Sequence, residues 1–141
     1  MAETQQQQQQ YQKPLPEITK QSKPFWDAAH EHKLVVQQCT QCQRYQYPPI
    51  DLCPVCAGEL TWVEASGKGE VHTFIIMHQL YHPAFKAELP YNVSVIQIEE
   101  GPFMLSNVVN CANEDIKIGM PVKVVFEDVT DEVTLPKWTP A

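Results

Sequence analysis

The distribution of apolar and polar residues divides the chain into three kinds of segment. Residues 1–22 have few apolar positions and include the run from Gln5 to Gln10. Such a segment cannot offset its ordering entropy by burial, so we expect a leader that is disordered or held by a partner. Residues 23–32 show helical spacing, and the remaining chain has short apolar runs separated by turn residues, which is typical of a mostly β protein.

The segment 23–32 predicts a short helix. Pro24 suits its first turn, and Phe25, Trp26 and Ala29 fall on one side. This side can pack on the chain's own strands. It can also dock on another subunit, because large aromatic residues dominate protein interfaces.

Seven runs with β-branched and aromatic content predict strands at residues 34–38, 60–63, 70–78, 91–98, 103–109, 121–126 and 133–138. A helical turn at 113–116 falls between the third and fourth of the last five strands, and no βαβ spacing occurs. Five such strands predict a small closed barrel of the OB type, because closure removes exposed edges. An open sandwich is the alternative.

Two Cys-x-x-Cys pairs lie between the first two predicted strands, Cys39 with Cys42 and Cys53 with Cys56. A two-residue gap lets both thiolates of a pair bind one ion, so the pairs predict a rubredoxin-like ribbon around one zinc ion. Four thiolates leave no coordination position for water, so this zinc would be structural. Disulfides, which need an oxidising compartment, and a redox pair, which would occur once near a βαβ unit, are the alternatives.

Composition narrows the function classes. The 141 residues carry a formal charge of −7 and a single arginine, Arg44, which disfavours binding to a phosphate backbone. No apolar run is long enough for a signal-peptide core or a transmembrane helix, so we expect a cytoplasmic protein that binds neither nucleic acid nor membrane. A single-stranded nucleic-acid-binding protein built from the same two modules is the rival from another class.

Several short motifs occur in the order seen in a family of small proteins that combine a zinc ribbon with an OB-fold. They are Pro24-Phe25-Trp26, residues 34–39, Pro48-Pro49, the two cysteine pairs, Ser66-Gly67-Lys68-Gly69, Pro90-Tyr91, Glu100-Gly101 and Ile118-Gly119-Met120-Pro121-Val122. The resemblance covers residues 23–138. The chain departs from it in the Gln-rich leader and at His32, where the family usually has a small residue before the first strand.

The family that this chain resembles consists of accessory subunits of thiolase-superfamily enzymes that act on acyl-CoA. Examples are found in archaeal thiolase and hydroxymethylglutaryl-CoA synthase assemblies, steroid side-chain aldolases and benzoylsuccinyl-CoA thiolase. The resemblance implies a non-catalytic zinc-containing subunit that stabilises a thiolase-like large subunit in a hetero-oligomer and helps shape an acyl-CoA site held mainly by that subunit. A free-standing acyl-CoA-binding protein is the alternative.

The chain offers no catalytic set of its own for such chemistry. Thiolase chemistry needs a nucleophilic Cys with partners that move protons, whereas four of the five cysteines are assigned to zinc and Cys111 is expected to be a small buried hydrophobic residue. Contacts with the partner or the acyl-CoA are predicted for Phe25, Trp26, Tyr81, His82, Phe85 and Lys86. We divide the chain into a leader (1–22), the helix with the zinc ribbon (23–63) and the OB-fold (64–141).

Overall fold

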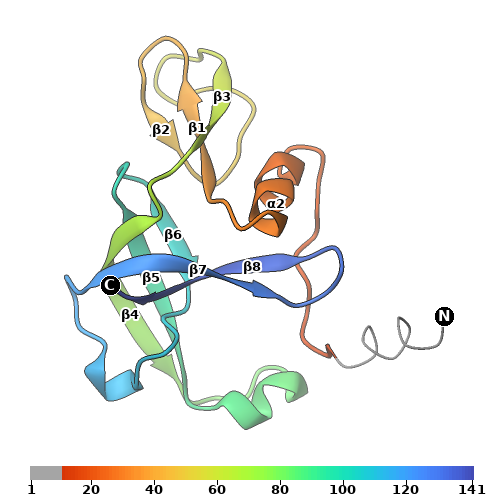
Figure 1. The fold of residues 1–141 in the computed structure, drawn as a ribbon, viewed down its shortest axis with the longest axis vertical. Helices are drawn as coiled ribbons and strands as arrows, with labels where there is room; N and C mark the ends of the chain where they lie inside the picture. Colours follow the sequence, from red (N-terminus) through yellow and green to blue (C-terminus); the bar gives the residue numbers. More distant parts are fainter. Residues whose placement is uncertain (1–10) are drawn as a thin grey trace, which may run out of the picture.

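The computed structural model describes residues 11–141, which form one α-helix, two short 3-10 helices and two antiparallel sheets. Figure 1 shows the smaller sheet above the larger one, with the helix beside their junction. The elements in chain order are α2 (Lys23–His30), β1 (Val35–Cys39), β2 (Tyr45–Gln46), β3 (Leu60–Glu64), β4 (Lys68–Met77), the 3-10 helix η1 (Pro83–Glu88), β5 (Tyr91–Ile98), β6 (Phe103–Ser106), the 3-10 helix η2 (Asn113–Asp115), β7 (Pro121–Asp128) and β8 (Thr134–Pro140).

The smaller sheet has the strand order β2-β1-β3 and forms the ribbon. β1 pairs along its whole length with β3 and ends with Cys39 opposite Leu60, whereas β2 contributes only two residues. The buried Gln37 side chain supplies further pairing, because its amide donates to the carbonyl of Ile50 and its oxygen accepts from the N–H of Ile50, both at 2.9 Å. The loop after β2 is therefore fixed to β1 by hydrogen bonds.

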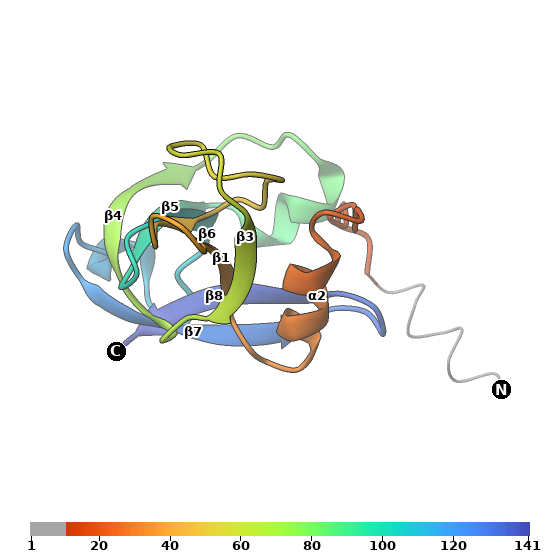
Figure 2. The same cartoon turned by 90° about the horizontal axis from the view of Figure 1, so that it is seen from above.

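The larger sheet has the order β6-β5-β4-β7-β8 and curls until its two edge strands meet, as Figure 2 shows. The N–H of Val109 donates to the carbonyl of Trp138 at 2.7 Å, and the N–H of Trp138 donates to the carbonyl of Asn107 at 3.0 Å. A parallel bridge joins Val108 to Trp138. The predicted OB-type fold is confirmed, in the form of a curled half-barrel that closes over only a few residues.

One buried amide side chain extends the pairing next to this closure. The Asn92 Nδ2 group donates to the carbonyl of Val108, and the Asn92 Oδ1 atom accepts from the N–H of Val108 and from the Ser94 hydroxyl, each at 2.8 Å. The last backbone pair between β5 and β6 is Ser94 with Ser106, so Asn92 continues this ladder with its side chain. The chain after β6 is thereby held in position to reach β8.

The helix α2 contacts both β1 and β8, and so joins the ribbon to the half-barrel. Phe25 is only 4% exposed and belongs to one apolar cluster with Leu34 and Val36 of the ribbon and with barrel residues such as Ile96 and Trp138. The helix therefore packs on its own chain, the first of the two interpretations of its apolar side. The ribbon and the half-barrel share a continuous core.

His32 occupies a left-handed backbone conformation, with φ of 58°. A side chain larger than that of glycine is disfavoured in this conformation. In this chain the imidazole ring stacks on Phe126 with ring centroids 5.3 Å apart, and its Nε2 atom lies 2.9 Å from Asp128 Oδ1. The bulky residue therefore adds a contact between the end of the helix and the β7 strand.

The described part of the leader lies along the rest of the chain. The Lys13 ammonium group is 2.7 Å from the Glu88 carboxylate in η1, and the Gln21 amide donates to Asp51 at 3.0 Å. The leader residues 1–10 lie outside the described residues, and the expectation that the leader is disordered or held by a partner stays a prediction. Within residues 11–141, no helix is long and apolar enough to cross a membrane.

Candidate metal centre and the groove beside it

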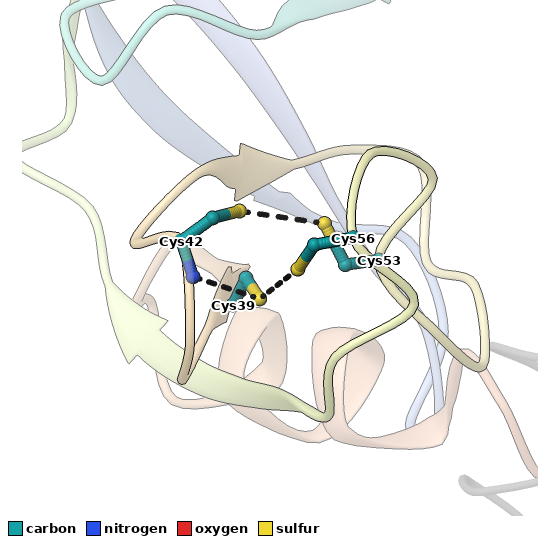
Figure 3. A group of neighbouring side chains, drawn as sticks. All are labelled: Cys39, Cys42, Cys53 and Cys56. Carbon is teal, nitrogen blue, oxygen red and sulfur yellow. Dashed lines mark hydrogen bonds between the residues drawn. The ribbon is translucent and has the colours of Figure 1, made fainter.

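Two turns with the same backbone geometry bring the four predicted zinc ligands together (Figure 3). In the first, the N–H of Gln43 donates to the carbonyl of Cys39 at 3.1 Å, and in the second, the N–H of Ala57 donates to the carbonyl of Cys53 at 2.9 Å. Gln43 and Ala57 each follow a cysteine pair and each adopt a left-handed conformation, with φ of 63° and 59°. Each turn thereby places both of its thiols on the same side.

The geometry of the cluster fits one metal ion. The four Sγ atoms lie within 4.8 Å of one another, with 3.4 Å between Cys39 and Cys56 and 3.6 Å between Cys42 and Cys53. A tetrahedral zinc with Zn–S bonds of about 2.3 Å places its sulfur ligands about 3.8 Å apart. The four cysteines are thus positioned to bind one metal ion, and four soft thiolates suit zinc.

The backbone around the cluster leaves room for the sulfur atoms. A Cβ atom added at the buried Gly58 would lie 2.9 Å from the Cys39 Sγ and 3.2 Å from the Cys56 Sγ, which is too close for ordinary packing. The N–H groups of Gln41 and Cys42 both lie 3.4 Å from the Cys39 Sγ. These groups can stabilise a thiolate, so the surroundings are built for sulfur in its charged form.

The thiols of the cluster differ in their readiness to ionise. Hydrogen bonding from the N–H of Cys42 is the main cause that lowers the pKa of Cys39 to about 6, and the N–H of Cys56 likewise lowers the pKa of Cys53. The pKa of Cys42 is raised to about 11, because desolvation and the neighbouring sulfur atoms outweigh the hydrogen bond from the N–H of Arg44. A divalent cation removes this conflict and allows all four thiols to bind as thiolates.

A groove of about 540 Å³ lies beside the ribbon, between α2, η1, β6 and β8. Its aromatic lining residues are Tyr11, Phe25, Trp26, Tyr47, Phe85 and Tyr91. The Lys13 ammonium group, already paired with Glu88, lies 5.4 Å from the centre of the Phe85 ring. Lys137 also lines the groove, and its ammonium group is 3.1 Å from the Glu127 carboxylate.

The structure separates the residues predicted to contact a partner or an acyl-CoA. Trp26 and Phe85 line the groove, and Phe25 reaches its wall from the buried core. Tyr81, which is 71% exposed, does not line the groove. His82 and Lys86 are likewise exposed residues outside its lining. The predicted contacts themselves stay predictions.

Sequence reasoning missed several residues of the groove. Tyr11 and Lys13 belong to a leader whose composition carries no packing signal, and only the contact between Lys13 and Glu88 reveals their position. Tyr91 begins β5, where the alternation of apolar and polar residues would place it in the core, whereas in the structure it faces outwards and packs on Phe85 of η1. A cluster of aromatic and basic residues from distant segments becomes visible only after folding.

Two family models match the chain in succession. The ChsH2 rubredoxin-like zinc ribbon domain matches residues 26–61, and the ChsH2 C-terminal OB-fold domain matches residues 62–127. A DUF35 domain-containing scaffold protein of Methanocaldococcus jannaschii is 32% identical over 101 residues, which are 70% of this chain and 71% of that protein. The chain belongs to the DUF35 family of zinc-ribbon and OB-fold proteins. The family suggested by the sequence motifs is thereby confirmed.

Two further similarities extend the comparison. A solved structure described as an Ltp2-ChsH2(DUF35) aldolase contains a chain that superposes with a TM-score of 0.81 at 35% identity, covering 89% of this chain and 98% of that one. A probable enoyl-CoA hydratase alpha subunit of Thermomonospora curvata is 38% identical over 131 residues, which are 92% of this chain. This chain spans only 40% of the length of that hydratase subunit.

Proposed function

We propose that this DUF35 protein is the non-catalytic zinc-containing subunit of a thiolase-type complex that forms or cleaves a carbon–carbon bond in an acyl-CoA. It stabilises the large subunit in a hetero-oligomer and helps shape the acyl-CoA site. The proposal rests on the structural match to a chain in a structure described as an Ltp2-ChsH2(DUF35) aldolase. The match covers 89% of this chain and 98% of that one. That structure combines a DUF35 chain with an aldolase, and we propose the same pairing of an accessory and a catalytic subunit for this protein.

The distribution of thiols supports a non-catalytic role. Four of the five cysteines lie in one cluster whose geometry suits a closed four-sulfur metal site. The fifth, Cys111, is partly buried, and its thiol contacts the carbonyl of Ala112 at 3.5 Å. No activating base is hydrogen-bonded to it among the described residues. Catalysis by the complex is therefore assigned to the large subunit.

The groove supports the second part of the proposal. Aromatic rings can stack on an adenine base, and lysines can meet phosphate groups. Lys13 and Lys137 bring cations to the groove, but each already has a carboxylate partner, Glu88 and Glu127. An acyl-CoA phosphate would have to compete for these cations, which fits a subunit that completes a site held mainly by its partner.

The proposal is tested by co-expressing the tagged chain with a thiolase-type large subunit encoded in the same genome. We expect the two chains to co-purify in a defined ratio, and we expect acyl-CoA turnover by the complex but not by this chain alone. Failure to co-purify would contradict the proposal. Micromolar, salt-sensitive binding of single-stranded oligonucleotides at about 0.15 M salt would instead favour the nucleic-acid-binding rival.

Two variants with matched controls separate docking from substrate contact. Trp26→Ala should weaken the complex by roughly 2 kcal/mol or more without loss of zinc, because aromatic anchors dominate interfaces. Trp62→Ala is its control, since Trp62 is also partly buried against the shared core but does not line the groove. Lys86 lies outside the groove lining, so Lys86→Ala tests whether an exposed part of η1 also contacts the acyl-CoA: it should raise the Michaelis constant and leave assembly unchanged. Lys117→Ala, an exposed lysine near η2, should change neither the Michaelis constant nor assembly.

A further inference from the structure

The polarity of β5 is inverted along the first half of the strand. Its residues alternate between half-buried and buried, so Tyr91, Val93 and Val95 face outwards while Asn92 and Ser94 face the barrel interior. When one face of an antiparallel sheet meets water, the side chains on that face are normally polar. Apolar side chains on both faces are typical of a strand that is covered on both sides. The apolar outward residues therefore indicate that something covers this face.

The neighbouring strands continue the same surface. Ile75 of β4 lies opposite Val93, and Leu105 of β6 lies opposite Val95. Ile75 is 56% exposed, Leu105 is 69% exposed and Phe103, also on β6, is 47% exposed. We call this surface the apolar sheet face, made of Ile75, Val93, Val95, Phe103 and Leu105. A contiguous exposed group of large apolar side chains marks an interaction site more often than scattered ones do.

The exposed positions of β7 show what a solvated strand looks like in this protein. Lys123, Glu127 and Asp128 are exposed and charged. The apolar sheet face carries no charged residue between Ile75 and Leu105, where Thr73 is its polar member. At its end the face becomes polar, because His72 packs against Phe103 with ring centroids 4.6 Å apart and Gln97 and Glu70 lie in the same cross-strand row as Phe103.

Charge and position identify the occupant of the apolar sheet face. A second copy would bring two chains of formal charge −7 together, whereas a different chain can supply the complementary basic rim. A stable interface covers roughly 800 Å² on each partner, more than these five partly exposed side chains can supply. Leu105 also lines the groove, so the face continues into the site assigned above to the acyl-CoA, which the large subunit mainly holds.

We propose that the apolar sheet face is the main docking surface for the thiolase-type large subunit, which presents an apolar patch with a basic rim. This inference rests on the proposed function and adds the location and chemistry of the contact. The interface runs from β4 across β5 to Leu105 and there meets the groove.

The test measures the affinity of the complex with Leu105→Glu and Ile75→Glu, on two different strands. Each should weaken binding of the large subunit by about 10-fold or more, because a charge is then buried without a partner. Ile118→Glu is the matched control, since Ile118 is 71% exposed but lies in the turn before β7. It should leave the affinity unchanged. Zinc content and circular dichroism establish that each variant folds.

The outcomes separate this inference from the proposed function. If the native chain binds the large subunit but neither face variant weakens binding more than Ile118→Glu, the docking surface is wrong and the proposed function stands. If the native chain binds no large subunit, the proposed function is wrong, and so is the proposal that the large subunit covers the apolar sheet face. If sedimentation shows that the native chain alone dimerises and Leu105→Glu is monomeric, a second copy covers the face and the proposed occupant is wrong.

Discussion

The ribbon and the half-barrel of this protein are held together by different forces. Between Cys39 and Leu60 the only buried residues are Cys39, Cys53 and Gly58, so the outer part of the ribbon has almost no apolar core. The half-barrel, by contrast, encloses a cluster of fully buried side chains that includes Val71, Ile96 and Trp138. Burial of apolar surface stabilises the half-barrel, whereas the outer ribbon depends on whatever holds its four sulfur atoms.

Folding of the outer ribbon should therefore depend on the metal, whereas folding of the half-barrel should not. The dependence should decrease along β1 and β3, because their far ends, at Val36 and Val63, pack against the core shared with the half-barrel. The metal cluster therefore orders the outer ribbon and, through Gln37 and the loop at Ile50, the wall of the groove near Tyr47. The following changes test this division, beginning with the largest expected effect.

Removing a metal ligand should unfold the outer ribbon and spare most of the half-barrel. Structural zinc contributes on the order of 10 kcal/mol or more in zinc-finger peptides, so Cys53→Ser should abolish stoichiometric zinc binding. Hydrogen exchange should then become fast at Cys39 and Leu60 and stay slow at Ile96. Cys111→Ser is the control and should keep one zinc per chain, because Cys111 lies outside the cluster.

Metal analysis and exchange together decide this prediction. Less than half an equivalent of zinc in the native chain would contradict the metal assignment. Simultaneous loss of protection in both sheets of Cys53→Ser would show that the ribbon and the half-barrel unfold as one unit.

Removing the amide of Asn92 should damage the half-barrel and leave the metal in place. Asn92→Ala deprives the buried backbone N–H and carbonyl of Val108 of their partners, at a cost of about 2–4 kcal/mol. Urea unfolding with zinc present measures this loss. Ser94→Ala removes only one of the three hydrogen bonds and should cost about 1 kcal/mol. Equal effects of the two variants would show that Asn92 does not hold the closure.

The ease with which these features could be predicted differs between the two regions. The ribbon was predictable because its ligands are encoded by spacing, and the OB-type fold was predictable because runs of β-branched and aromatic residues mark its strands. Strict alternation along 70–78 places His72 and Phe74 on one face, but a register shift between Val71 and Thr73 leaves His72 exposed and Phe74 packed on the core. Such an irregularity depends on the partner strands and leaves no mark in the local pattern.

The groove was not predictable for a related reason. The contact between Lys13 and Glu88 joins residues from a leader with no apolar signal and from the segment 79–90, which lies between two predicted strands. Within that segment the 3-10 helix η1 begins after His82, whose Nδ1 atom accepts from the N–H of Ala84 at 3.2 Å. Local propensity is weak for so short a helix, and its position against Tyr91 is set by tertiary packing.

A methyl group at Gly58 should weaken the metal site without removing a ligand. Gly58→Ala places a Cβ atom 2.9 Å from the Cys39 Sγ, so the sulfur atoms must move apart. We expect zinc affinity to fall about 10-fold to 100-fold, as for changes in the surroundings of metal ligands, while the half-barrel is unaffected. Competition with a chromophoric chelator measures this. Gly101→Ala is the control for a methyl group away from the metal: its positive φ of 116° makes alanine strained and should lower stability, but no atom lies within 4 Å of the added Cβ, so zinc affinity should stay native.

The smallest expected effect concerns the contact between the helix end and β7, and it depends on pH. The Thr134 hydroxyl donates to Asp128 at 2.6 Å, and this bond, followed by that from His32, lowers the pKa of the Asp128 carboxyl. A lowered pKa in the folded state stabilises the protein above the ordinary aspartate pKa near 4, and this contribution is lost as pH falls through the lowered value. Native chain and Asp128→Asn should therefore differ in unfolding free energy at pH 7, begin to converge near about pH 4 and coincide only below the lowered pKa of Asp128. Asp131→Asn, an exposed aspartate in the same turn, controls for charge, and an identical pH dependence in both variants would assign the effect to net charge rather than to this contact.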